Sequence, residues 1–586
     1  MRAETRCGNE KTLVNDRGRA HPRVSFFAGE ISKWLKGVDC KSIRFSVRGF
    51  ESLSHHHFLD LFPAFPPAEF ALCGRFSVQV AGARERGACR SLTATVPRRI
   101  FCPPMEEFSA ATAALRAALG ENVVRTDAES RFAASFDNTK ISFLPEAVVF
   151  PRDEADIAEM LRRANAARVP VTVRGAGTGT TGAPAPICGG WVISLAHWTA
   201  LEIDAASLTA TVQPGVITQK ISDAAAEVGL FYPPDPASVK HCSIGGNIAT
   251  NAGGLHAAKY GVTRDYVLAL EGFLPTGEKV RWGGAVKKYV SGYNLRDLWI
   301  GSEGMLGIVT KAVLRLAPLP QARHTFLCAF PSDADALRAA QLLPDTRVVP
   351  SVCEFLDTLS VVGAERLSGK HFFEKASAVL LVEVDGDAQS VPEQAARVRN
   401  WARGNASEFR ETSDADEAES LWEVRRVCSQ AMFLIADSKL NEDVVVPAKN
   451  FIPLLDSMRR ITAETGLETP IFGHAADGNL HVHVMYHRLD VRERTLAQVA
   501  IRRVMETVVA LGGVITGEHG IGLAKSPFLA IQHSPAEIAA MRAVKRALDP
   551  NNILGRGKMF EPFNIWDCEP VQVVLPWDKP PPKSGA

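Results

Sequence analysis

The sequence predicts an α+β fold with two unlike halves. In the first half, a short strand at 147–150, a helix that begins at Asp153 and a strand at 171–173 form a β-α-β unit. This unit ends in a glycine-rich loop, residues 174–182. The second half indicates a separate α+β layer, with helices at 334–343 and 392–402 and a strand at 379–384.

The composition is that of a globular protein with several domains. The chain has 586 residues, of which 46% are hydrophobic and 22% are charged, enough for about three to four domain-sized units. A net charge of +1 argues against nucleic acid as a partner, because nucleic-acid-binding proteins usually carry a strong basic excess. The eleven cysteines include no CxxC pair, so a reducing compartment such as the cytoplasm fits best.

Residues 1–104 differ in composition from the rest of the chain. They contain 17 Lys and Arg against 9 Asp and Glu, a net charge of +8, and show no sustained helix or strand period. We expect a disordered extension that is dispensable, with Met105 as the true start of the protein. The alternative is a targeting or partner-binding arm, which the basic bias favours.

The glycine-rich loop contains a GxGxxG match at 177–182, the pattern of a Rossmann turn. A Rossmann turn needs a helix directly after the glycines, whereas Ala183-Pro184-Ala185-Pro186 follows here. We therefore predict a nest of backbone amides, with Arg174 at its edge, that binds a pyrophosphate. The alternative is a flexible surface linker.

Two further segments are rich in small residues. Residues 243–254 hold so many Gly, Asn and Ala that we expect them to form no packed element and to lie against a large flat ligand. Residues 301–310 repeat this composition before a strand.

A histidine-bearing strand is predicted at 480–486. Its apolar residues alternate with His481 and His483, so the two imidazoles share one face. The turn signal at 477–479 predicts that His474 folds back towards this strand.

Glu518 and His519 lie in a second glycine-flanked segment, TGEHGIG at 516–522. One carboxylate and two imidazoles suit Zn²⁺ or a similar divalent ion, so we assign His474, His481 and Glu518 as metal ligands. His519 is then available as a general base. The alternative is that each histidine is a hydrogen-bonded structural residue.

The motifs RGAGTGTTG, PPDPAS, SIGGNIATNAGG, KYG, SGYNL and GSEGMLGIVT resemble the FAD-binding domain of the vanillyl-alcohol oxidase superfamily. HAADGNLHVHV, TGEHGIG and LDPNNIL are similar to the substrate domain of its D-lactate, glycolate and D-2-hydroxyglutarate dehydrogenase branch. The resemblance implies a two-part FAD-binding domain of the PCMH type at 105–319 and an α+β cap with an antiparallel sheet and the metal site at 320–535. A returning segment at 536–562 and a disordered tail at 563–586 complete the expected organisation.

The resemblance also implies FAD in extended form, with its pyrophosphate at 174–182 and its isoalloxazine near 244–254 and 303–308. Thr178 stands where some relatives carry a histidine that tethers FAD, so non-covalent FAD is expected. The implied cofactor-binding residues are Arg174, Gly175, Ala176, Gly177, Thr178, Gly179, Gly182, Pro234, Ser238, Ile244, Gly245, Gly246, Asn247, Ala249, Asn251, Gly253, Tyr260, Gly261, Glu303, Gly304 and Ile308.

Two residues are expected to bind substrate. The WxxR pattern at 422–425 implies that Arg425 pairs with the substrate carboxylate, and Asn479 is the second candidate. The alternative for Arg425 is a solvated position on an amphipathic helix. The spacing of Lys439 and Asp443 differs from that of D-2-hydroxyglutarate enzymes, which disfavours a site for a second substrate carboxylate.

The expected function is FAD-dependent, metal-assisted oxidation of a small D-2-hydroxy acid to the 2-oxo acid. Electrons would pass on to a quinone, a cytochrome or an electron-transfer flavoprotein. The sequence also allows a homodimer and peripheral attachment of the protein at the inner face of the membrane. Two rivals are a non-catalytic flavin subunit of a glycolate oxidase-like complex and a metal-dependent hydrolase.

Overall fold

The computed structural model describes residues 108–374, 377–565 and 568–576, together with the backbone of four short strands near the N-terminus. The chain divides into two compact units, residues 1–99 and 100–586. In the first unit, the described strands are β1 (Leu13–Val14) paired with β2 (Ala20–His21), and β3 (Arg44–Arg48) paired with β4 (Ser77–Ala81). The predicted disorder of residues 1–104 otherwise lies outside the described residues.

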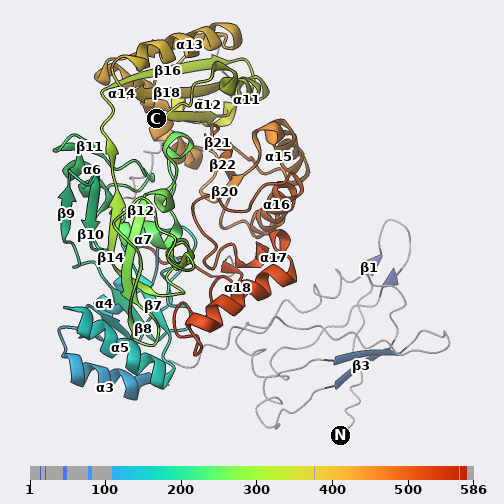
Figure 1. The fold of residues 1–586 in the computed structure, drawn as a ribbon. Coiled ribbons are helices and arrows are strands. Elements are labelled where there is room, and N and C mark those ends of the chain that lie inside the picture. The colour runs from blue at the N-terminus through green and yellow to red at the C-terminus, as the bar shows by residue number, and fades with distance from the viewer. Residues whose placement is uncertain are drawn as a thin grey trace. The chain divides into compact units, whose positions relative to one another are not determined.

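The predicted β-α-β unit lies near the start of the second unit (Figure 1). β6 (Ala147–Val149), α5 (Glu154–Ala167) and β7 (Val171–Arg174) follow one another, and the Asp153 side chain caps α5 by accepting the Asp156 N–H. Both strands pair in parallel with β8 (Trp191–Ser194), which lies between them. The remaining elements of this layer are β5 (Val124–Arg125), α3 (Ser109–Leu119) and α4 (Ala128–Ala133).

A five-stranded antiparallel sheet follows, in the order β13-β12-β14-β10-β9. Its strands are β9 (Leu201–Asp204), β10 (Thr209–Val212), β12 (Val267–Phe273), β13 (Lys279–Gly283) and β14 (Ile308–Arg315). β11 (Leu230–Phe231) pairs with β15 (Ala317–Pro318). The helices of this part are α6 (Thr218–Ala226), α7 (Ile244–Thr250), α8 (Ala257–Tyr260), α9 (Thr263–Tyr266) and α10 (Leu295–Trp299).

The structure corrects the expectation that residues 243–254 form no packed element. Helix α7 occupies their centre, and its Ile244 and Ile248 are buried in the core beneath the five-stranded sheet. Small residues are needed because the helix lies against other backbone: a Cβ at Gly245 would be 2.9 Å from the Pro214 carbonyl oxygen. Close packing of a short helix is therefore one reason for the glycines.

The cap is built on a seven-stranded antiparallel sheet, in the order β19-β16-β18-β17-β21-β22-β20. This arrangement confirms the predicted α+β cap with an antiparallel sheet. The strands are β16 (Ala322–Phe330), β17 (Val352–Leu356), β18 (Ala378–Gly386), β19 (Glu408–Thr412), β20 (Ser438–Val445), β21 (Ile471–His474) and β22 (Asn479–Tyr486).

Helices cover both faces of the cap sheet. One hydrophobic core joins the sheet to α11 (Asp333–Leu342), α13 (Ser390–Asn405), α15 (Phe451–Thr465) and α16 (Val491–Ala510). A second core on the opposite face joins it to α12 (Thr358–Ser368) and α14 (Ala415–Ala431). Because residues alternate between faces along a strand, the leucine and valines of β22 enter the first core and its histidines face α14.

The chain then returns to its first layer. After α17 (Leu529–Gln532) and α18 (Pro535–Leu548), the Ile553 carbonyl accepts the Val171 N–H at 2.7 Å, and the Gly555 N–H donates to the Val171 carbonyl at 2.9 Å. The predicted disorder of the tail is wrong for part of it, since Ile565 is only 1% exposed. The cause is apolar: Ile565 packs into a small core with Leu523.

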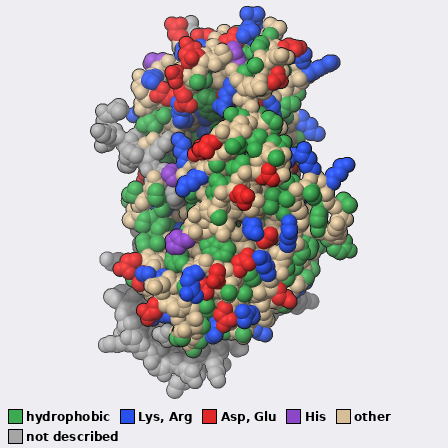
Figure 2. All heavy atoms as spheres, turned by 60° about the vertical axis from the view of Figure 1, so that its left-hand side comes forward, with side chains coloured by type: hydrophobic (Ala, Val, Ile, Leu, Met, Phe, Trp, Pro, Cys, Tyr) green, Lys and Arg blue, Asp and Glu red, His purple; other side chains and the backbone are tan. Residues whose placement is uncertain are grey.

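The surface agrees with the low net charge. On the described part of the face in Figure 2, Lys and Arg side chains are interspersed with Asp and Glu side chains. Among the described residues, no helix is both long enough and apolar enough to cross a bilayer.

Candidate active site

The hairpin of β21 and β22 brings two histidines together. His474 lies opposite Asn479 in the register of the two strands. The turn requires glycine at Gly478, where φ is +85° and a Cβ would lie 2.3 Å from the Val446 carbonyl oxygen. The imidazole centroids of His474 and His481 are 5.5 Å apart. The predicted strand, its turn and the convergence of two imidazoles are thereby confirmed.

Glu518 completes a cluster with these histidines. Its Oε1 atom lies 3.6 Å from His481 Nε2 and 4.0 Å from His474 Nε2. One ligand atom from each of the three side chains lies within 4.8 Å of the other two. His519 Nε2 is 3.9 Å from the same carboxylate oxygen. The structure therefore gathers at one place all four residues that the sequence assigned to metal binding and proton transfer.

The surroundings of His474 fit a metal ligand. Its Nδ1 atom pairs with the buried Glu354 carboxylate, which leaves Nε2 facing Glu518. Metal-bound histidines commonly use their second nitrogen in this way. Burial disfavours the charged imidazolium, but the Glu354 carboxylate outweighs burial and raises the pKa of His474 to about 9. A metal would take the place of that proton between the imidazole and Glu518.

Arg425 shares the same carboxylate. Its Nε atom donates to Glu354, and its guanidinium lies 4.9 Å from the centre of the Phe472 ring. The alternative of a solvated arginine is wrong for Arg425, because Glu354 and Phe472 hold it against the sheet, whereas Arg426 is exposed and pairs with Glu419. Within the described residues, the two terminal NH2 groups of Arg425 make no hydrogen bond, so they are open to a carboxylate ligand.

His481 and His483 are buried on the same face of β22. Burial lowers the pKa of His481 well below its usual value, and repulsion from His474 and His519 lowers it further. Burial has the same effect on His483, whose two ring nitrogens find no hydrogen-bond partner among the described residues. His483 stacks on Phe472 with 4.5 Å between ring centroids. Both imidazoles are therefore neutral, and His481 is in the form that binds metals.

The carboxylate of Asp443 on β20 holds the loop that carries Glu518 and His519. It accepts the N–H groups of Gly517, Glu518 and His519 at 2.8, 2.6 and 3.0 Å, and it pairs with the Lys525 ammonium. Burial alone would raise the pKa of Asp443, but His519, Lys525 and the N–H donors outweigh burial and hold the pKa far below its usual range. Asp443 is therefore an ionised anchor for the loop.

Glu303 holds the same loop from the FAD-binding part. It has a φ of +55°, and its two carboxylate oxygens accept the N–H groups of Ile521 at 2.7 Å and Gly522 at 2.9 Å. The resemblance assigns Glu303 to FAD, but its carboxylate is already occupied by these two donors. The Glu303 side chain therefore positions the cap loop, and its role towards FAD stays a prediction.

Other predicted residues also make internal contacts. The Tyr260 hydroxyl lies 2.9 Å from both oxygens of Asp385 on β18 and donates to this carboxylate, so it joins the two parts of the chain. The Asn251 side chain accepts the Arg264 N–H at 2.9 Å. The Asn479 side chain donates to the Val444 carbonyl at 3.1 Å, so its amide nitrogen is engaged. A substrate role for Asn479 can rest on its oxygen or on its second N–H.

The glycine-rich loop 174–182 differs from these residues, because most of its N–H groups make no hydrogen bond among the described residues. Within the described structure, none of the N–H groups of residues 175–181 donates to a protein acceptor; Gly182 alone donates, to the Asp137 carboxylate at 2.7 Å. No helix follows Gly182, which agrees with the rejection of a Rossmann turn. A row of open N–H groups fits a pyrophosphate. Arg174 bends back, with NH1 donating to the Phe136 carbonyl at 2.7 Å.

The expected cofactor segments adjoin one another and the histidine cluster. A Cβ at Gly175 would lie 2.7 Å from Ser243 Oγ at the start of α7. After α7, a Cβ at Gly253 would lie 3.2 Å from Glu518 Oε2. The Thr181 carbonyl accepts the Leu523 N–H, directly after the cap loop, at 2.7 Å. Segments far apart in sequence are thus adjacent in the fold.

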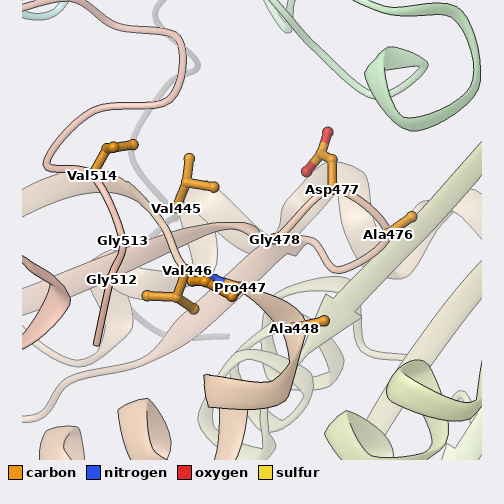
Figure 3. A pocket seen from close by; sticks show the side chains of 10 residues that line it. All are labelled: Val445, Val446, Pro447, Ala448, Ala476, Asp477, Gly478, Gly512, Gly513 and Val514. Carbon is orange, nitrogen blue, oxygen red and sulfur yellow. The ribbon is translucent and has the colours of Figure 1, made fainter.

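A cavity of about 350 Å³ adjoins the β21–β22 turn. Figure 3 shows that its wall is mostly small residues and backbone, with Asp477 at one side. His474, His481, Glu518 and His519 are not among its lining residues. We therefore assign no part of the reaction to it.

Sequence analysis did not single out Glu354 or assign Asp443 to the site. A signal for Glu354 existed, since a lone carboxylate interrupts the apolar strand Val352–Leu356. Asp443 sits in the alternating run of β20 and lies opposite His481 in the sheet. Neither signal shows which side chains or N–H groups the carboxylate contacts.

Comparison with known families decides the class of protein. Residues 145–283 match the family described as FAD binding domain, and residues 319–559 match the family described as FAD linked oxidases, C-terminal domain. The glycolate oxidase subunit GlcD of Bacillus subtilis is 39% identical over 436 residues, which cover 73% of this chain and 92% of that protein. The chain belongs to the FAD-linked D-2-hydroxyacid dehydrogenase branch of the vanillyl-alcohol oxidase superfamily.

Two further comparisons agree with this membership. D-lactate dehydrogenase of Anaerostipes hadrus is 34% identical over 429 residues, covering 71% of this chain and 89% of that protein. The solved structure of p-cresol methylhydroxylase with substrate bound superposes with a TM-score of 0.65 at 18% identity, over 80% of this chain and 99% of that one. The predicted PCMH-type fold, FAD as cofactor and an FAD-linked oxidoreductase are therefore confirmed.

Proposed function

We propose that this FAD-linked oxidoreductase oxidises a small D-2-hydroxy acid, of the glycolate or D-lactate type, to the 2-oxo acid. The observation that carries the proposal is the 3.2 Å between Glu518 Oε2 and a Cβ at Gly253, in the segment expected near the flavin ring. A substrate held at the cluster would lie beside the flavin, as hydride transfer requires. The names of a glycolate oxidase subunit and a D-lactate dehydrogenase among the relatives support the same substrate class.

The side chains have separate roles in this proposal. His474, His481 and Glu518 would hold a divalent metal, which when bound acts as a Lewis acid on the substrate's hydroxyl and carboxylate oxygens. Two histidines and one glutamate are a known catalytic set for zinc, so Zn²⁺ is the expected ion. The terminal NH2 groups of Arg425 would hold the substrate carboxylate in a fork.

The substrate loses a proton and a hydride by different routes. His519 would accept the hydroxyl proton at Nε2, the nitrogen 3.9 Å from Glu518 Oε1. Bound FAD supplies the redox chemistry by accepting the hydride from Cα. The protein's own part is to orient the hydroxyl towards His519 and Cα towards the flavin.

An anaerobic substrate screen tests the proposal. Glycolate, D-lactate and D-2-hydroxyglutarate are mixed in turn with the purified protein, and loss of visible flavin absorbance is followed; L-lactate is the matched control. We expect a D-2-hydroxy acid to bleach the flavin and L-lactate to leave it oxidised. A flavin that no hydroxy acid bleaches would favour a non-catalytic flavin subunit. Hydrolysis of an ester or amide by flavin-free protein would favour a hydrolase.

Non-covalent attachment of FAD is part of the proposal. It is supported by Thr178, which offers no imidazole for a covalent link. Denaturing the protein should release yellow FAD into the supernatant, and flavin that stays with the precipitate would contradict this.

The acceptor and the assembly complete the proposal. Electrons would leave to a quinone, a cytochrome or an electron-transfer flavoprotein, from a cytoplasmic protein that attaches peripherally to the membrane or forms a homodimer. Turnover with each acceptor class in turn, with and without added vesicles, and light scattering for the mass in solution test these points.

A further inference from the structure

Asp443 does more than anchor a loop. It is fully buried on β20, directly opposite His481 in the sheet register. Its Oδ2 atom accepts the three loop N–H groups, whereas its Oδ1 atom faces the Lys525 ammonium and the ring of His519. The Thr516 hydroxyl lies within hydrogen-bond distance of both oxygens, whereas only Oδ2 accepts the loop N–H groups and only Oδ1 lies near the proposed base.

The His519 ring has a buried nitrogen in need of a partner. Its Nδ1 atom lies 3.3 Å from Asp443 Oδ1, yet the two atoms are not aligned for a hydrogen bond and Nδ1 has no other partner among the described residues. Hydrogen bonds at catalytic sites are often long or poorly aligned before substrate binds and tighten in the complex.

We propose that Asp443 is a positioning residue for His519: it accepts a hydrogen bond from the Nδ1–H group and thereby keeps Nε2 free to receive the substrate's hydroxyl proton. Asp443 itself stays ionised, so the proton that leaves the substrate ends on His519 and goes no further. The Lys525 ammonium fixes the side of the carboxylate that His519 meets. The inference rests on the proposed function, in which His519 is the base.

The substitution Asp443→Asn separates this role from loop anchoring. The amide oxygen can still accept the three loop N–H groups, while its NH2 group replaces the oxygen that faces His519. An NH2 group can only donate to Nδ1, which moves the imidazole proton to Nε2. The base would then carry its proton on the nitrogen that should receive one.

Two neighbouring residues provide matched controls. Glu442 is also buried and lies 3.5 Å from Lys525 Nζ, but among the described residues its carboxylate contacts neither His519 nor the loop. The Thr516 hydroxyl donates to Asp443 and accepts the Gly520 N–H at 3.1 Å, so Thr516→Val loosens the loop without touching the imidazole. Glu442→Gln and Thr516→Val are made beside Asp443→Asn.

Flavin content, metal content, KM and the rate of flavin reduction by the best hydroxy acid are measured for each protein. We expect Asp443→Asn to keep both cofactors and a KM within about 3-fold of the unmodified protein, and to reduce flavin about 10²–10⁴-fold more slowly. Glu442→Gln and Thr516→Val should stay within about 3-fold in rate. In a His519→Ala background, Asp443→Asn should not lower the rate of flavin reduction further, because its effect passes through His519.

Three results would overturn the inference: an Asp443→Asn rate within about 3-fold, an equal loss in Thr516→Val, or a full further loss in the His519→Ala background. If Asp443→Asn is insoluble, Asp443→Asn with Lys525→Met replaces it, since this pair removes the ammonium that would face the new amide. An unmodified protein whose flavin no hydroxy acid reduces would reject the proposed function and this inference with it. An active enzyme with an unaffected Asp443→Asn variant would reject the inference alone.

Discussion

The two glycine-rich loops of this protein use their backbones in opposite ways. In loop 174–182, the N–H groups of residues 175–181 have no acceptor among the described residues. In loop 516–522, every N–H from Gly517 to Gly522 is bonded: to Asp443, to the Thr516 hydroxyl or to Glu303. Within the described part of the chain, the first loop therefore leaves most of its backbone N–H groups open, whereas those of the second, from Gly517 to Gly522, are all bonded.

The difference shows what glycine is for in each loop. Gly177 has a φ of +75°, and a Cβ there would be 2.4 Å from the Arg174 guanidinium, so glycine keeps the nest open. A Cβ at Gly517 would lie 2.7 Å from the Asn479 amide nitrogen, so glycine there lets the loop press against β22. Because buried N–H groups need acceptors, buried carboxylates from two other segments bond the second loop.

The largest expected effect comes from the side chain that the second loop presents. Glu518→Gln removes the ligand charge, so bound metal should fall well below one per chain and turnover by about 10³-fold, equivalent to the several kcal/mol a Lewis acid contributes. Flavin content should not change, because the loop is bonded through its backbone. Metal analysis and flavin absorbance measure both. His483→Ala, on the same face of β22, is the control that should keep its metal. Metal retained in Glu518→Gln would contradict the proposed metal site.

A methyl group in the first loop tests the open backbone. Gly177→Ala should weaken FAD binding by about 10-fold or more, since a non-glycine residue at positive φ costs about 1–2 kcal/mol and the methyl also displaces Arg174. Gly179→Ala is the matched control, because the closest atom to a Cβ there is 3.8 Å away. Titration of flavin-free protein with FAD gives both affinities. Equal losses at the two positions would contradict the nest.

Removing a loop acceptor should have a smaller effect. Glu303→Gln leaves only one of two acceptor oxygens for Ile521 and Gly522, so the free energy of unfolding should fall by about 1–3 kcal/mol. Denaturant melts measure this change. Flavin content should stay at the level of the unmodified protein; a variant that loses FAD but not stability would show Glu303 to be a cofactor-binding residue.

The smallest effect is a pH dependence at Glu442. Burial raises the pKa of Glu442 to about 7, although Lys525 opposes the shift. A carboxyl whose pKa is higher in the folded state contributes stability below its unfolded pKa, and that stability is lost as pH rises through the folded pKa. Glu442→Gln should therefore match the unmodified protein in acid and exceed it by at most about 3 kcal/mol above pH 7. Thermal melts from acid to neutral pH test this, and a constant difference would contradict it.

Local sequence patterns predicted much of this fold. The β-α-β unit, the α+β layer of the cap and the hairpin of β21 and β22 follow from periodicity and turn residues that act over a few positions, whereas the antiparallel arrangement of the cap sheet was implied by the resemblance. His474 and His481 are seven positions apart and meet because a tight turn joins their strands. Misjudged segments have an equally local explanation: residues 243–254 look like loop by composition, yet Ile244 and Ile248 give their centre one apolar face to bury.

The sequence by itself therefore predicted the candidate metal ligands, the candidate base and the glycine nest. His474 and His481 lie in one hairpin and Glu518 and His519 in one short loop, and the geometry within each segment is set locally. Only the tertiary structure decided what holds them. Glu354 is 120 positions from His474, and Glu303 is 218 positions from Ile521. A carboxylate within an apolar strand can be recognised as unusual in a sequence. Its partner depends on which strands and loops pack against it, and that packing forms only when the two parts of the chain fold together.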